Sequence, residues 1–201
     1  QFETSTRRLR FGITSNVGGR QNNEDTAFAI LMSAEVTGNP PPLGVFIVAD
    51  GMGGHQHGEV ASSITARTIA QSTLQEIMIP QLEEREMSAD QKTIPEVLSD
   101  AMSIANSMVQ SQVPGGGTTA TCVMIRGDLA YIAHVGDSRA YLFSEGSLET
   151  ITRDHLLVRR LQELGNLSSE EADSHPQRNV LYRAIGQSES LEVDASTRRL
   201  Q

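Results

Sequence analysis

The sequence predicts an α+β fold in which helices cover antiparallel β-sheets. Three observations lead to this prediction: apolar, β-branched runs near the start, two long amphipathic segments after them, and a later group of short strands separated by tight turns. Because strands and helices occur in blocks rather than in strict alternation, antiparallel sheets are favoured over a parallel βαβ sheet. The length of 201 residues suits one globular domain, so we expect a single domain over residues 1–201.

Strands are expected first, at residues 10–15, 27–32 and 43–49. The last of these, LGVFIVA, is a continuous apolar run, which is typical of a strand with both faces buried. The three prolines just before it cannot donate hydrogen bonds to an interior sheet, so residues 38–42 are expected to form an exposed turn.

Two helices are expected next. The first covers residues 58–79, has an apolar face that includes Val60, and should stop at Pro80, which cannot donate a helical hydrogen bond. The second covers residues 93–112 and has an inward face that includes Ile104. Its opening TIPE fits a capping box, in which Thr and Glu satisfy each other's backbone amides.

A second group of strands follows, and the short turns between them predict an antiparallel meander. Its members are residues 119–125, 129–135, 140–143 and 148–151. From Asp154 onward short helices are expected, one of them opened by a second capping box, SSEE, at residues 168–171.

Composition limits the classes of partner. The formal net charge of −9 argues against nucleic acid or an anionic membrane, because both are bound by clustered lysine and arginine. No apolar stretch is long enough to cross a bilayer and no signal pattern opens the chain, so we expect a cytoplasmic protein without a membrane segment. The single cysteine, Cys122, lies in an apolar run and is interpreted as a small buried hydrophobe.

The sequence VADGMGG at residues 48–54 places Asp50 at the end of an apolar strand. A carboxylate there is costly to desolvate unless a cation or several donors meet it, and the adjacent glycine would let the Gly51 carbonyl approach the same ion. The alternative is that Asp50 caps the following helix. A dinucleotide-binding loop is excluded, because the GxGxxG spacing would need glycine where Gln56 stands.

Two further acidic turns precede or follow strands. Glu24 and Asp25 lead into the strand at residues 27–32, with Arg20 nearby as a planar donor suited to phosphate; a solvated turn is the alternative. Asp137 occupies a Gly-Asp turn between two later strands, where local pairing with Arg139 would also explain it.

The histidines suggest zinc as an alternative metal. His55 and His57 form an HxH pair that could bind zinc, and His155 and His175 follow later. Zinc is the weaker hypothesis, because no third ligand of the usual type accompanies the pair.

Four motifs in register resemble the bacterial branch of the PPM family, the protein phosphatase 2C type. They are RQNNED at residues 20–25, VADGMGG at 48–54, GTTA at 117–120 and VGDSR at 135–139. SHPQRN at residues 174–179 and RAIG at 183–186 resemble the flap of that branch, so the resemblance spans nearly the whole chain.

The resemblance implies a four-layer α-β-β-α sandwich with a helical flap over about residues 154–186. It also implies hydrolysis of protein phosphoserine and phosphothreonine by a metal-bridged water, with phosphorylated proteins as partners and an opposing kinase. Two Mn²⁺ or Mg²⁺ ions are implied, with a third, weaker site. The implied roles are metal bridging by Asp50, metal binding by the Gly51 carbonyl, by Glu24 and Asp25, and at the third site by Asp137, and phosphate binding by Arg20.

The chain departs from the family pattern in two places. Met52 stands where eukaryotic relatives have a histidine proposed as general acid, and His55 is the only nearby substitute. The family's last two aspartate motifs do not occur before Gln201, and Asp194 lies too early to replace them, so we expect the C-terminal part of the domain to be missing. Three hypotheses stay open: part of an active phosphatase, a catalytically impaired short form that binds phosphoproteins or regulates, or another metal- or nucleotide-binding enzyme.

Overall fold

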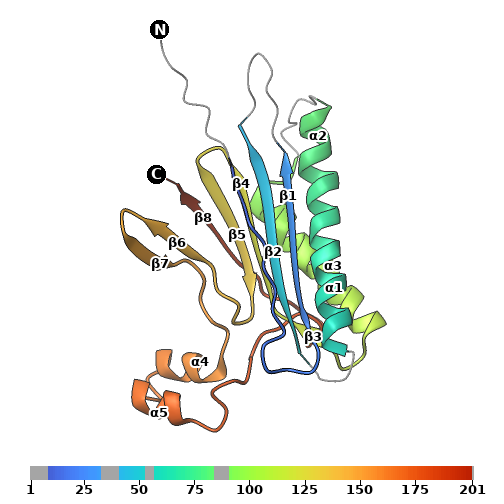
Figure 1. Cartoon of the computed structure of the whole chain (residues 1–201). Coiled ribbons are helices and arrows are strands. Elements are labelled where there is room, and N and C mark those ends of the chain that lie inside the picture. Colours follow the sequence, from blue (N-terminus) through green and yellow to red (C-terminus); the bar gives the residue numbers. More distant parts are fainter. Residues whose placement is uncertain (1–8, 33–40, 53–56, 84–90, 201) are drawn as a thin grey trace.

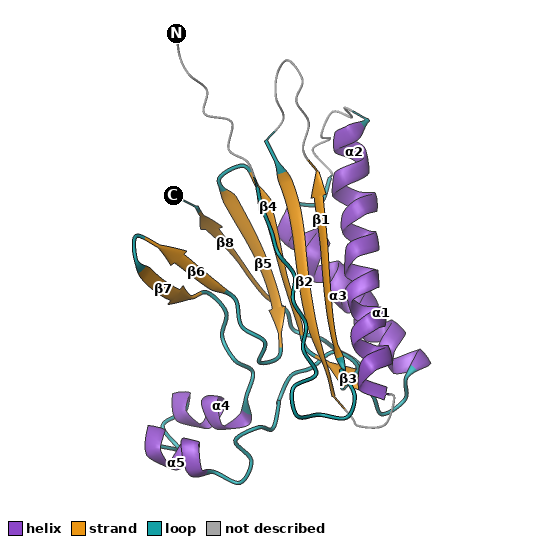
Figure 2. Ribbon diagram, viewed as in Figure 1, coloured by secondary structure: helices purple, strands orange, loops and turns teal. Residues whose placement is uncertain are grey.

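The computed structural model describes residues 9–32, 41–52, 57–83 and 91–200. Its fold is α+β, as predicted, with a six-stranded antiparallel sheet, a separate two-stranded sheet and helices (Figures 1 and 2). The elements are β1 Asp25–Met32, β2 Leu43–Met52, α1 His57–Thr73, a π-helical turn Leu74–Met78, α2 Ile79–Leu82, α3 Ile94–Gln112, β3 Gly117–Thr118, β4 Ala120–Arg126, β5 Leu129–Val135, β6 Tyr141–Ser144, β7 Ser147–Thr150, α4 Leu157–Glu163, α5 Ser169–Ser174 and β8 Asp194–Arg199.

The large sheet has the strand order β1-β2-β4-β5-β8, and β3 pairs with the end of β2. Figure 1 shows α1 and α3 packed side by side on one face of this sheet, while the β6–β7 hairpin lies on the other side and α4 and α5 stand apart near one end. The predicted combination of two antiparallel sheets with helices is therefore confirmed.

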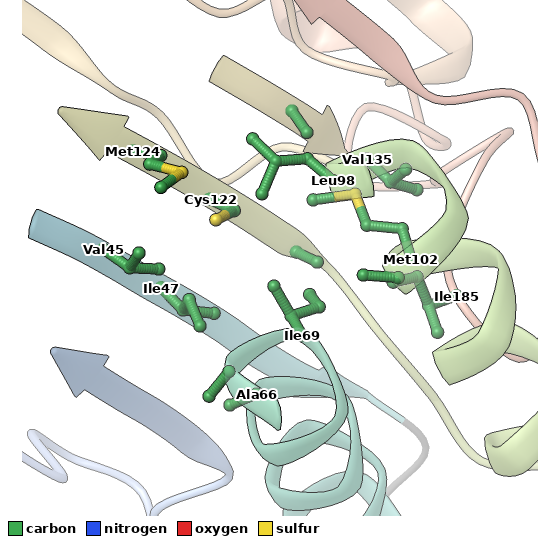
Figure 3. Close-up of a cluster of buried hydrophobic side chains, with 14 of the residues drawn as sticks. Val45, Ile47, Ala66, Ile69, Leu98, Met102, Cys122, Met124, Val135 and Ile185 are labelled. Atoms are coloured by element: carbon green, nitrogen blue, oxygen red, sulfur yellow. The ribbon is translucent and has the colours of Figure 1, made fainter. Parts of the chain in front are cut away.

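The core lies between the large sheet and the pair α1 and α3. Alternate residues of β2 face the helices because successive side chains of a strand point to opposite faces, and Val45 and Ile47 are at most 1% exposed. Ile69 of α1 and Met102 of α3 belong to the same buried cluster (Figure 3). The remaining β2 side chains, Asp50 among them, therefore point to the face away from the helices.

The strand expected at residues 10–15 is wrong. This segment has no strand geometry and crosses the sheet face, with the Phe11 ring 5.9 Å from that of Phe46. Among the described residues no neighbouring backbone pairs with it, and an isolated extended segment without a ladder partner does not form a strand.

The helix end expected at Pro80 is also wrong. A π-helical turn follows α1, and the Ile79 amide donates to the Leu74 carbonyl five residues back. Pro80 then lies near the start of α2, where a missing amide proton interrupts the ladder without ending it, and the helix continues to Leu82.

The four later strands do not form one meander. The hairpin β4–β5 belongs to the large sheet, whereas β6–β7 pairs only with itself, and β5 instead pairs with β8. The sequence of β8, DASTRR, lacks apolar alternation, because five of its six residues are exposed at the sheet edge. Its existence was therefore not predicted.

Both expected capping boxes are confirmed. The Glu96 carboxylate accepts hydrogen bonds from the Thr93 amide and hydroxyl, each at 2.7 Å, where α3 begins. The Ser168 amide donates to Glu171 at 2.8 Å, and the Glu171 amide donates back to the Ser168 hydroxyl at 3.2 Å. Across the described ranges, every helix is too short or too polar to traverse a lipid bilayer.

Candidate active site

Two adjoining cavities at the end of β2 bring all six predicted site residues together. The larger, about 600 Å³, is lined by Arg20, Glu24, Asp50, Gly51, Met52, Thr119, Asp137, Asn179, Val180, Leu181 and Gln187. The smaller, about 400 Å³, shares four of these residues and adds Asp25 together with residues 16–17 and 21–23. Segments far apart in sequence therefore converge on one place.

The strand register sets the central pair of acids. Asp25 opens β1 and is the direct antiparallel partner of Asp50 near the end of β2. Directly opposite residues on neighbouring strands have their side chains on the same face, so the two carboxyl groups share one side of the sheet. The Asp25 amide donates to the Asn23 side chain at 3.1 Å, which fixes the turn that enters β1.

The backbone of Asp50 is held by two threonines. Its amide donates to the Thr119 hydroxyl at 2.9 Å, and its carbonyl accepts from the Thr118 hydroxyl and the Thr119 amide, both at 2.9 Å. The Thr119 hydroxyl also lies 2.7 Å from that of Ser138, next to Asp137. The GTTA and GDSR motifs therefore contact each other and connect the turn of Asp137 to Asp50.

Glu24 is held where β2 meets the start of α1. Its carbonyl accepts from the Gly51 amide at 3.1 Å and from the buried Ser62 hydroxyl at 2.7 Å. A Cβ at Gly58 would lie 2.7 Å from the Glu24 carboxylate, so only glycine leaves room for this side chain. The first turn of α1 therefore shapes the acidic side of the site.

Electrostatics show that the site is short of positive charge. Burial, together with the charges of Asp25 and Asp137, raises the pKa of Asp50 to about 6, while the charge of Arg20 acts in the opposite direction. Asp50 is reached by solvent through the open cavity, yet protein atoms surround its remaining sides. Burial also raises the pKa of Asp137 above its usual range. An acidic group with a raised pKa gains from any cation placed beside it.

The local alternative for Asp137 is not supported. Arg139 forms a two-pronged ion pair with Asp154, at 2.8 and 2.5 Å, and makes no hydrogen bond to Asp137. The capping alternative for Asp50 is not supported either, because Asp50 lies inside β2 and α1 begins only at His57.

The described part of the chain contains no zinc site. His55 lies outside the described residues, and His57 is exposed at the start of α1. His155 is buried against Asp194, and the His175 ring accepts the Gln177 amide at 3.1 Å. These rings are therefore not gathered around a common point.

The acids present fit a hard divalent cation. All the predicted ligand atoms are oxygens, the ligand type that Mg²⁺ and Mn²⁺ prefer. Within the described ranges, however, no three acid, histidine or cysteine groups form a complete ligand set. A backbone carbonyl such as that of Gly51, together with water, would therefore have to complete the coordination.

Sequence reasoning missed several residues that line the site. Asn179, Leu181 and Gln187 lie in the segment between α5 and β8, and the sequence analysis did not place them beside Asp50. Ser138 belongs to a recognised motif, but its contact with Thr119 depends on how β4 and β5 pair.

Comparisons with known proteins agree with this geometry. Residues 9–166 match the family described as Protein phosphatase 2C. The serine/threonine phosphatase stp of Listeria monocytogenes is 37% identical over 194 residues, which is 96% of this chain and 69% of that protein. The stp of Listeria innocua is 37% identical over 175 residues, and this chain spans 66% of its length.

Solved structures give the same result. The serine/threonine phosphatase PstP/Ppp of Mycobacterium tuberculosis superposes with a TM-score of 0.68 at 30% identity, covering 90% of this chain and 69% of that one. Stp1 of Staphylococcus aureus gives 0.69 at 28% identity, covering 96% and 75%. The chain belongs to the protein phosphatase 2C (PPM) family of metal-dependent serine/threonine phosphatases.

Proposed function

We propose that this chain carries the catalytic site of a serine/threonine protein phosphatase that hydrolyses phosphoserine and phosphothreonine. The observation that carries the proposal is the convergence of Arg20 with Glu24, Asp50 and Asp137 around one open cavity. An arginine beside clustered carboxylates suits a phosphate group, because the acids hold cations and the guanidinium binds the phosphate oxygens that remain.

In this proposal Asp50, the Gly51 carbonyl, Glu24 and Asp25 hold two cations, Mn²⁺ or Mg²⁺, and Asp137 serves a third, weaker site. A catalytic domain of PstP has been crystallised with two manganese ions and superposes on this chain with a TM-score of 0.60 at 28% identity. The raised pKa of Asp50 supports the proposal, since burial and neighbouring acids leave its charge uncompensated. When bound, such ions polarise phosphate oxygens and lower the pKa of a coordinated water.

The chain's own residues have separate tasks. Arg20, exposed at the cavity rim, would orient the phosphate and neutralise charge that develops on its oxygens. Thr118 and Thr119 hold Asp50 rigidly through its backbone. Asn179 and Leu181, in the proposed flap, line the same cavity, where the protein part of the substrate would lie.

Phosphorylated proteins, with an opposing kinase, are the partners that this chemistry requires. A cytoplasmic location is part of the same proposal, supported by the single cysteine, which is free and buried as disulfide-poor cytoplasmic proteins allow. We also propose that residues 1–201 belong to one phosphatase domain, with residues 154–186 as its flap.

The test measures manganese-dependent phosphate release from a phosphothreonine peptide. We expect Asp50→Asn to lower kcat/KM by about 10³-fold and Arg20→Lys by about 10²-fold, because lysine keeps the charge but loses the planar fork. Asp128→Asn is the matched control, since Asp128 lies at the opposite end of the β4–β5 hairpin and pairs with Arg199. Equal turnover in all four proteins would rule out the assigned site.

A second candidate is an impaired form that binds phosphoproteins without hydrolysing them. It is favoured by the incomplete ligand set among the described residues. This candidate predicts that the phosphothreonine peptide binds in calorimetry, that Arg20→Lys weakens the binding, and that no phosphate is released. Turnover that depends on both manganese and Asp50 would exclude it.

A further inference from the structure

His155 is a buried polar residue to which the proposed chemistry assigns no task. Its side chain is 1% exposed, and it follows Asp154 in the segment that leads from β7 to α4. The ring lies between those of His134 and Tyr182, with centroid separations of 5.0 and 5.5 Å. A histidine buried this completely needs partners for both ring nitrogens.

On one side His155 holds the turn of Asp137. Its Nδ1 accepts the Gly136 amide at 3.0 Å, and its own amide donates to the Gly136 carbonyl at 2.8 Å. The His134 Nε2 donates to the same carbonyl at 3.1 Å. Gly136 has a φ of +112°, and a Cβ there would lie 2.6 Å from Thr119. Both backbone polar groups of the residue before Asp137 are therefore fixed by histidines.

On the other side His155 contacts Asp194 and the segment that contains Tyr182 and Arg183. Its Nε2 lies 3.1 Å from Asp194 Oδ2, and its carbonyl accepts the Tyr182 amide at 2.9 Å. Arg183 donates to the other Asp194 oxygen at 2.7 Å and to Glu192 at 2.5 Å. The backbone of His155 therefore bonds to the segment next to Val180 and Leu181, and its imidazole is linked to Arg183 through Asp194.

These contacts select one tautomer. The Gly136 amide can be satisfied only if Nδ1 carries no proton, and a neutral ring then carries its proton on Nε2, which donates to Asp194. Arg183 Nη1 also lies 3.2 Å from Nε2, but accepting that proton would require the reverse tautomer and leave two hydrogens facing each other at Gly136. Burial lowers the pKa of His155, so the ring is neutral near pH 7.

We propose that His155, protonated on Nε2, is a positioning residue that couples the flap, through Asp194 and Arg183, to the turn of Asp137. Asp137 and the flap residues Asn179, Val180 and Leu181 line the same cavity. The ring bonds to Gly136 and to Asp194, and Asp194 accepts a hydrogen bond from Arg183 of the flap. A displacement of the flap is then transmitted to Asp137, and a cation or substrate that orders Asp137 also orders the flap. The catalytic consequence rests on the proposed function, whereas the coupling is a property of the fold.

The first test reads the tautomer directly in the intact chain. Long-range ¹H–¹⁵N NMR spectra at pH 7.5 distinguish a ring nitrogen that carries a proton from one that does not. The proposal expects a neutral His155 with its proton on Nε2. A proton on Nδ1, whether the ring is neutral with its proton there or charged with protons on both nitrogens, would overturn it. This measurement needs no variant and therefore no assumption about folding.

The second test separates the two sides by substitution. His155→Asn places an amide oxygen where Nδ1 lies and keeps an acceptor for Gly136, while His155→Gln places an amide nitrogen near Nε2 and keeps a donor for Asp194. We expect hydrogen exchange of the Gly136 amide to accelerate about tenfold in the glutamine variant and to stay within about threefold in the asparagine variant. Equal rates in the two variants would contradict the assignment.

The decisive coupling variant is Asp194→Ala, because Asp194 makes no contact with Gly136. The proposal expects exchange at Gly136 to accelerate about threefold or more, since the ring loses the partner that fixes Nε2. Asp173→Asn, an exposed change on α5, is the control and should leave the rate unchanged. An unchanged rate in Asp194→Ala would overturn the coupling. None of these measurements requires turnover, so an inactive chain would count against the proposed function alone.

Discussion

Asp25 and Asp50 lie directly opposite each other on β1 and β2, on the sheet face away from the helices. Like charges in this arrangement repel, and the charge of Asp25 contributes, after burial, to the raised pKa of Asp50. A protein that keeps this pair without a cation keeps a destabilising contact. The pair therefore links ion binding to stability, and the link can be measured.

Asp50→Asn should stabilise the metal-free chain while it removes activity. The raised pKa of Asp50 means that its charged form is disfavoured in the folded state, so the neutral amide should add about 1 kcal/mol to the free energy of unfolding at pH 8, a value reduced for solvent exposure. Urea unfolding with EDTA measures the gain. Adding manganese should reverse the order of stability of the two proteins, because only the wild type is stabilised by binding the ion.

Asp50 and the two buried histidines, His134 and His155, give opposite dependences of stability on pH. The folded pKa of Asp50, about 6, exceeds its ordinary value of 3.8, so its contribution to stability is present below pH 3.8 and is lost as the pH rises through about 6. His134 and His155 have lowered pKa values because they are buried, so their contribution is present above about pH 6.5 and is lost on acidification.

The Asp50→Asn background isolates the histidines. In that variant, without metal, the free energy of unfolding should fall steadily from pH 7 to pH 5, whereas the wild type should show a shallower slope because protonation of Asp50 compensates. Urea unfolding curves at half-unit pH intervals provide the measurement. Parallel slopes for the two proteins would show that Asp50 does not titrate in this range.

Strand segments with a strong sequence signal were predicted close to their observed bounds, whereas segments without such a signal were missed. Residues 129–135 were predicted with the bounds that β5 has, because β-branched and alanine residues there are bounded by turn signals. The strand ending at residue 49 continues to Met52, since Asp50 and Gly51 are poor strand formers that become paired only when β1 and β3 flank them. Strand propensity alone does not show which neighbouring strands will pair with a segment.

The helices were located correctly, and most residues of their predicted inward faces pack in the core. Val60 and Ile104 were expected inside, yet they are 44% and 49% exposed. In α1 the buried face includes Ile69, as predicted, and also small residues such as Ala61 and Ala66, which let the helix approach the sheet closely. Small side chains carry little hydrophobic signal, so counting apolar residues missed Ala61 and Ala66 and included Val60.

The acidic residues of the site could be predicted from the sequence, but the other residues that line the cavities could not. Asp25, Asp50 and Asp137 follow from strand ends and motifs, and the structure places them around connected cavities. Gln187 and the contact between His155 and Asp194 depend on the path of residues 180–194, which no local pattern encodes. Tertiary pairing alone brings these groups to the site.

Cys122 should be inert while the chain is folded. It is fully buried in β4 beneath the helices, and burial raises the pKa of its thiol to about 12, so almost no thiolate exists at pH 8. We expect the thiol reagent DTNB to react within seconds in 8 M urea and not over an hour in buffer. Stoichiometric reaction of the native protein within minutes would show that β4 opens locally.

Gly51→Ala should be among the most destabilising single changes in the chain. A Cβ at Gly51 would lie 2.1 Å from the Gly58 carbonyl oxygen and 2.7 Å from the Glu24 carbonyl oxygen, and neither backbone group can move alone. The start of α1 must then separate from β2, at a cost of about 3 kcal/mol or more in the free energy of unfolding. Gly12→Ala, with nothing within 4 Å of the added carbon, is the matched control and should stay within about 0.5 kcal/mol. Urea unfolding of both variants decides the matter: equal midpoints would mean that β2 and α1 are not packed as closely as the structure places them.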